Sequence, residues 1–138
     1  MQAKPILAEI APGELIDKIT ILQIKSKRIT DAGKLQNVLV EHQVLTAARD
    51  AAMPATDALD ELTAQLKQVN EALWDIEDAI RDCEREGDFG PQFIELARSV
   101  YHSNDRRAAL KREINELLGS KLVEEKSYAP YGAIRADG

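Results

Sequence analysis

This chain of 138 residues has a single cysteine, no long apolar run and no stretch that we expect to be a leader sequence. Cys83 is the single cysteine, so no intrachain disulfide can form, and cysteine usage does not indicate an oxidising compartment. No run approaches the roughly 18 apolar residues of a membrane-spanning helix, and the stretch MQAKPILAEI is too weakly apolar for a signal peptide. We therefore expect a cytoplasmic protein without membrane insertion.

The chain also lacks an excess of basic residues. Lys and Arg number 18 against 24 Asp and Glu, which leaves a formal net charge of −6. Nucleic acids require a basic face and anionic membranes attract clustered cations, so both partners are disfavoured. Aromatic residues make up 4% of the chain whereas 44% is hydrophobic, which is typical of helical proteins rich in Leu, Ile, Val and Ala.

Recognised catalytic and cofactor motifs are missing as well. No P-loop, G-x-S-x-G, G-x-G-x-x-G or H-E-x-x-H pattern occurs. His42 and His102 are the only histidines, and neither has a partner at a recognised metal-ligand spacing. We therefore expect no metal site and no cofactor.

Helical periodicity is present, and it predicts helices over about 13–31, 34–52, 57–86 and 92–118. The third helix has the clearest pattern, a coiled-coil-like seam with steps of three and four residues. Its seam residues are Leu59, Leu62, Leu66, Val69, Leu73, Ile76, Ile80 and Cys83. The break E-G-D-F-G-P gives a short loop, which favours an antiparallel hairpin with the fourth helix. We expect an all-α bundle built on this hairpin, as a single domain over 1–138.

The two ends of the chain are less regular. The tail over 119–138 has no helical period, whereas Leu122–Val123 and the alternation of Ile6, Ala8 and Ile10 suggest short extended segments. These two segments are expected to lie against each other.

The first helix is apolar on nearly every side of its wheel. Such a helix is central in its own bundle or is covered by a second chain. Four helices of this size leave part of such a surface open, so we expect a homo-oligomer, most simply a dimer, formed through this helix or the open side of the hairpin.

The fourth helix interrupts its expected core face with Asn104, Arg107 and Lys111. If the hairpin folds at 88–89, facing residues have numbers that sum to about 177. The expected pairs are Leu73–Asn104, Glu71–Arg106, Asn70–Arg107 and Leu66–Lys111.

Two explanations of this interruption remain open. In the structural one, these cations meet the acidic third helix and set the hairpin register, with Asn104 specifying the pairing. In the other, they bind an anion between helices, since stacked cations repel unless something negative lies between them. If Glu77, Asp78 or Asp17 supplies the negative charge beside these cations, no ligand is needed.

Other charged residues extend the list of candidates. Lys18 and Arg81 complete a possible anion clamp with Arg107 and Lys111, and Lys126 lies in a compact polar tail motif, V-E-E-K-S-Y. Asp17 falls among apolar residues, where a carboxylate is either paired with a cation or acts as an acid or base.

Three stretches resemble a small bacterial family of unknown function: GELIDKITIL at 13–22, LARSVYHSNDRRAALKREIN at 96–115 and VEEKSY at 123–128. The similarity covers nearly the whole chain. Because that family has no assigned activity, the resemblance implies no catalytic residue. It implies only that the polar residues inside these stretches are better candidates than other surface charges, namely Asp17, Lys18, Asn104, Asp105, Arg107 and Lys126.

The leading functional hypothesis is a non-enzymatic helical module that self-associates. The alternative is a binder of an anionic metabolite, or a small enzyme acting on one, held between helices by Arg and Lys. Charge substitutions distinguish the two, because a register-setting cation affects stability whereas a binding cation affects affinity.

Overall fold

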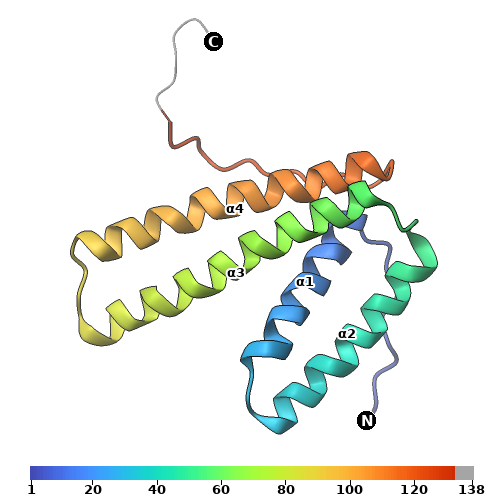
Figure 1. The fold of residues 1–138 in the computed structure, drawn as a ribbon, viewed down its shortest axis with the longest axis horizontal. Helices are drawn as coiled ribbons and strands as arrows, with labels where there is room; N and C mark the ends of the chain where they lie inside the picture. Colours follow the sequence, from blue (N-terminus) through green and yellow to red (C-terminus); the bar gives the residue numbers. More distant parts are fainter. Residues whose placement is uncertain (133–138) are drawn as a thin grey trace, which may run out of the picture.

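The computed structural model describes residues 1–132, and this part of the chain contains four helices and no strand. They are α1 (Pro12–Arg28), α2 (Ala32–Ala52), α3 (Asp57–Glu86) and α4 (Pro91–Leu117) (Figure 1). The predicted all-α bundle is confirmed. The last part of the expected irregular tail, 133–138, lies outside the described residues.

Local sequence accounts for the helix ends. The Asp31 carboxylate accepts a hydrogen bond from the Lys34 amide at 2.8 Å and so begins α2, which explains why α1 ends at Arg28 and not near residue 31. The Thr56 hydroxyl caps α3 by accepting from the Leu59 amide. Gly87 ends α3 in the left-handed conformation, with φ of 68°, where a residue without Cβ is favoured.

The helices form two hairpins that meet at α1. α3 and α4 lie side by side and extend beyond the other pair, while α1 and α2 leave them at an angle (Figure 1). α1 packs against all three other helices, whereas α2 packs against α1 only. The apolar residues that made α1 a predicted central helix are 0–7% exposed: Leu15, Ile16, Ile19, Leu22 and Ile24. Their own chain covers these five residues, whereas Ile21 and Ile29 of the same apolar stretch are only half-buried.

The main core lies where α1 crosses the α3–α4 hairpin, and it corrects the expected pairing. Leu110, and not Lys111, joins Leu66 in this core. Ion pairs between α3 and α4 are absent from the described residues, and Arg106 donates to Gln65 at 3.4 Å in place of the expected Glu71 contact. α4 packs on α1 as well as on α3, and Arg107 and Lys111 make their ion pairs with α1 and the tail. The expected set of Asn104, Arg107 and Lys111 therefore faces α1 and the tail.

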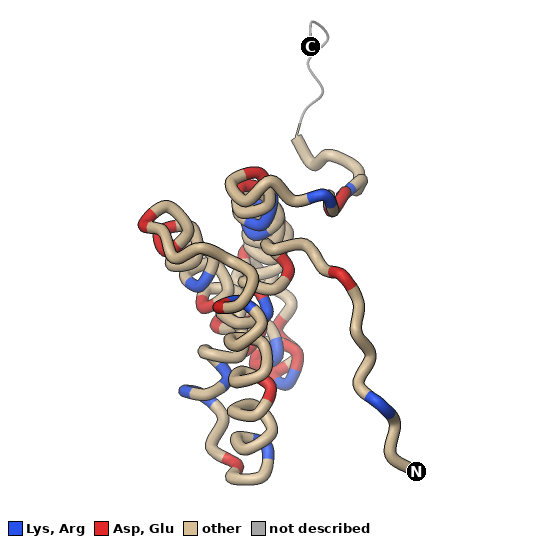
Figure 2. Tube along the Cα trace, turned by 90° about the vertical axis from the view of Figure 1, so that its right-hand side faces the viewer, with Lys and Arg blue, Asp and Glu red and all other residues tan. Residues whose placement is uncertain are grey.

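Both ends of the chain are extended and largely exposed. Residues 1–10 leave the body of the helices before α1, with Ile6 and Leu7 at 93% and 94% exposure (Figure 2). The tail after α4 returns along that helix through residues 119–131, which we call the C-terminal strap. The two ends share no strand and no backbone hydrogen bond over 1–132, so the expected contact between them is not formed.

Candidate functional site

A buried polar network centres on Asp17, whose residue exposure is 1%. One carboxylate oxygen accepts from Asn70 Nδ2 of α3 and from Arg107 Nε of α4, each at 2.9 Å, and the other accepts from Arg107 Nη2. The same Asn70 nitrogen also donates to the Thr20 hydroxyl at 2.9 Å. Three helices are thus joined through one carboxylate.

The bidentate bond with Asp17 raises the pKa of Arg107, although burial acts in the opposite direction. Of the two stacked cations, Arg107 is thus paired with Asp17, one of the three internal carboxylates that the sequence offered. It also occupies both oxygens of Asp17, and Asp17 is not among the residues that line the groove described below.

The N-terminus of α1 touches α4 at a second polar contact. The Gly13 amide donates to Asn115 Oδ1 at 2.7 Å, and both residues are buried. A Cβ atom on residue 13 would lie 2.4 Å from the Lys111 carbonyl oxygen, so only glycine permits this approach. The first turn of α1 is thereby pressed against the last turns of α4.

Lys111 lies between two carboxylates from different parts of the chain. Its Nζ is 2.7 Å from Glu14 Oε2 of α1 and 2.8 Å from Glu124 Oε2 of the strap, and its side chain is 8% exposed. Burial lowers the pKa of this ammonium, but hydrogen bonds to Glu124 and Glu14 outweigh it, so that the pKa is raised overall. Lys111 is therefore a charged, nearly buried group between α1 and the strap.

Two further contacts hold the strap on α4. Glu125 pairs with Arg112 at 3.2 Å, and Lys126 pairs with Asp105. The Lys126 ammonium and the Tyr131 hydroxyl keep the pKa of Asp105 below its ordinary value. A carboxyl whose pKa falls on folding stabilises the seated strap above its ordinary pKa, and this contribution is lost as the pH falls through the lowered pKa.

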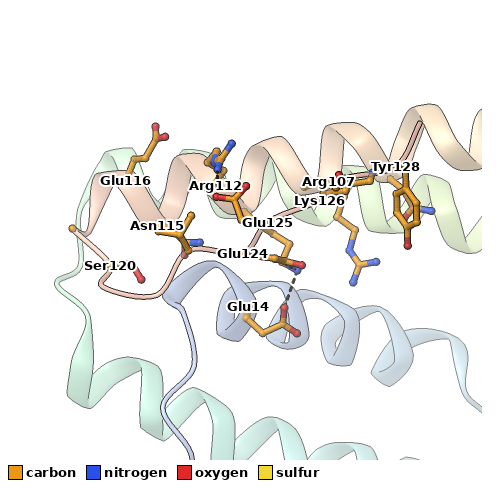
Figure 3. Close-up of a pocket in the computed structure, with 16 residues that line it drawn as sticks. Glu14, Arg107, Arg112, Asn115, Glu116, Ser120, Glu124, Glu125, Lys126 and Tyr128 are labelled. Carbon is orange, nitrogen blue, oxygen red and sulfur yellow. Dashed lines mark hydrogen bonds and ion pairs between the residues drawn. The ribbon is translucent and has the colours of Figure 1, made fainter. Parts of the chain in front are cut away.

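These elements enclose a groove of about 880 Å³ between α4, the start of α1 and the strap (Figure 3). In this view the Arg107 side chain points from α4 toward α1, and the strap residues lie over α4. The cations that line the groove are Arg107, Lys111, Arg112 and Lys126; the carboxylates are Glu14, Glu116, Glu124 and Glu125. A smaller hollow of about 570 Å³, containing Tyr101 and Tyr131, shares Asn104, Lys126 and Tyr128 with it.

The groove brings together four of the six predicted anion-binding candidates: Asn104, Arg107, Lys111 and Lys126. The other two lie elsewhere. Lys18 pairs with Glu14 at 3.8 Å, and Arg81 pairs with Glu77 at 3.5 Å; neither lines the groove. Sequence reasoning did not single out Arg112, Asn115 and Gly13, although all three lie in the stretches 13–22 and 96–115 that carry the family resemblance.

Two classes of feature are absent from residues 1–132. No group of three or more His, Cys, Asp or Glu side chains is placed to hold a metal ion. No helix within the same range has the length and apolarity needed to cross a membrane.

Comparison with known proteins gives one match. A family model described as a family of unknown function (DUF6165) matches residues 6–135. No curated protein and no solved structure matches the chain.

Proposed function

This chain belongs to the DUF6165 family of unknown function, and we propose that it binds a small anionic metabolite in the groove between α4 and the C-terminal strap. The observation that supports the proposal is the convergence of Lys111, Arg112 and Lys126 on one hollow, beside Arg107, whose guanidinium is bound to Asp17. Arg supplies bidentate donors to phosphate or carboxylate, and Lys supplies a point charge. We place this function in the cytoplasm, the compartment expected from the sequence.

The size and composition of the groove suit a metabolite. Its volume of about 880 Å³ is within the range of small-molecule sites, and the Asn104, Asn115, Ser120 and Tyr128 side chains add neutral polar groups to its wall. The proposal concerns binding and not catalysis, because Asp17, the one candidate acid or base, has both oxygens bound by other side chains and does not line the groove.

Calorimetric titration with inorganic phosphate at constant ionic strength tests the proposal. We expect phosphate to bind the wild type, and Arg112→Gln to weaken it about tenfold through loss of one charge-assisted hydrogen bond. Arg112 is suitable because its side chain is 52% exposed and, within residues 1–132, pairs with Glu125 of the strap and with no other carboxylate. Arg81→Gln removes a charge outside the groove whose side chain is 75% exposed, and it should leave the affinity unchanged. Equal affinities in all three proteins, or no binding at millimolar phosphate, would contradict the proposal.

We also propose self-association as a second function. The sequence suggested it through the apolar first helix, whereas the present argument rests on exposed apolar residues before α1 and on α2. Ile6 and Leu7 stand almost fully exposed before α1, and Val40 and Val44 of α2 are 51% and 62% exposed on a helix that packs only against α1. Exposed apolar groups of this kind are typical of surfaces that contact a partner, and a second copy is the simplest one.

Sedimentation equilibrium at low micromolar concentration tests self-association. We expect a dimer for the wild type and a monomer for Ile6→Ser/Leu7→Ser, because those side chains contribute nothing to the core of the single chain. Ala3→Ser, in the same exposed segment, is the matched control. A wild type that sediments as a monomer would exclude the second function without affecting the first.

A further inference from the structure

The C-terminal strap carries two adjacent carboxylates, and each holds a different cation of the groove. Glu124 lies 2.8 Å from Lys111 Nζ, and Glu125 lies 3.2 Å from Arg112 Nη2. Both glutamates are more than half exposed, whereas the Lys111 side chain is 8% exposed. The strap therefore presents two anionic groups, from the solvent side, to cations that belong to α4.

The strap is held much less firmly than the helix it covers. It forms no helix or strand, and its described contacts with α4 include the exposed pairs at Arg112 and Asp105 and the packing of the Tyr131 ring against Tyr101 and His102. Exposed ion pairs contribute little to stability. Removing Glu124 also leaves Lys111 paired with Glu14, 2.7 Å away on α1, so the nearly buried ammonium keeps a partner when the strap leaves.

We infer that the strap acts as an internal competitor, and that the ligand of the groove carries two adjacent anionic groups, as a diphosphate does, which replace Glu124 and Glu125. This inference rests on the proposed binding function and specifies its ligand class and its regulation. Lys111 takes one anionic group as a point charge, and the planar Arg112 guanidinium takes the other. The carboxylates of Glu124 and Glu125 and the two anionic groups of the ligand cannot occupy the same two cations at once. The apparent affinity is therefore the intrinsic affinity multiplied by the fraction of molecules in which Lys111 and Arg112 are free of the strap carboxylates.

Calorimetric titration with inorganic pyrophosphate, compared with inorganic phosphate, tests the inference. We expect pyrophosphate to bind the wild type more tightly than phosphate does, and Glu124→Gln/Glu125→Gln to bind pyrophosphate about tenfold more tightly than the wild type, as a strap seated in nine molecules of ten requires. Glu84→Gln/Glu86→Gln, which removes two exposed charges from α3 outside the groove, is the control for net charge and should bind like the wild type.

Amide chemical shifts separate displacement from a general charge effect. Pyrophosphate should shift the wild-type strap amides of residues 121–128 toward those of the Glu124→Gln/Glu125→Gln variant. If that variant binds pyrophosphate no better than the wild type, or if pyrophosphate binds no better than phosphate, the inference is overturned while phosphate binding by itself still supports the proposed function. If phosphate binds none of the proteins at millimolar concentration, the proposed function fails and the inference fails with it.

Discussion

Replacing Gly13 by alanine is expected to lower the free energy of unfolding by about 3 kcal/mol, at the upper end of overpacking effects. The added Cβ would lie 2.4 Å from the Lys111 carbonyl oxygen and 2.9 Å from Asn115 Oδ1. The first of these atoms belongs to the backbone of α4 and cannot rotate away. The first turn of α1 must therefore move off α4, which also strains the hydrogen bond from the Gly13 amide to Asn115.

Gly33→Ala is the matched control, because Gly33 is likewise the second residue of its helix. A Cβ there meets only the Asp31 carboxylate, at 3.4 Å, so alanine should be neutral or stabilising by up to about 1 kcal/mol through its better helix propensity. Urea denaturation of the three proteins measures the difference. Equal stabilities of Gly13→Ala and the wild type would show that α1 does not approach α4 as closely as described.

The helical architecture could be predicted because it depends on local periodicity. The seam of α3, from Leu59 to Cys83, repeats with the period of a helix that packs on one side, and all its members are buried or half-buried. The central position of α1 followed from its all-round apolar wheel. Helix ends were less predictable. Whether Asp31 begins α2 or α1 continues past Arg28 depends on a single hydrogen bond, from the Lys34 amide to the Asp31 carboxylate.

The candidate site was predicted only in part, because its contacts join residues that are far apart in the sequence. The bond between Asp17 and Arg107 spans 90 positions, and the one between Gly13 and Asn115 spans 102. The charged residues of α4 were found because they interrupt its apolar core face. Periodicity shows which side chains share a face of a helix, but it does not show which other helix packs against that face. With α3 assumed as the sole neighbour, Lys111 was assigned to the core position that Leu110 occupies.

Replacing Arg107 by methionine is expected to cost about 3–5 kcal/mol of unfolding free energy, as is usual when one member of a buried pair is removed. The Asp17 carboxylate, in a residue that is 1% exposed in the wild type, would then keep the Asn70 amide as its side-chain donor. Asp17→Asn should cost less, about 2 kcal/mol, because the Arg107 side chain is 31% exposed and can turn toward water.

The double variant Asp17→Asn/Arg107→Met separates a structural link from a binding residue. A neutral asparagine needs no cation, so the double variant should be more stable than Arg107→Met alone, which requires a coupling energy of about 3 kcal/mol by urea denaturation. Arg85→Met, which breaks a pair whose members are 70% and 61% exposed, should change stability by less than about 0.5 kcal/mol. If instead Arg107→Met unfolds like the wild type and the two changes add, Arg107 is free to serve a ligand, and the internal anion at Asp17 does not account for the cations of α4.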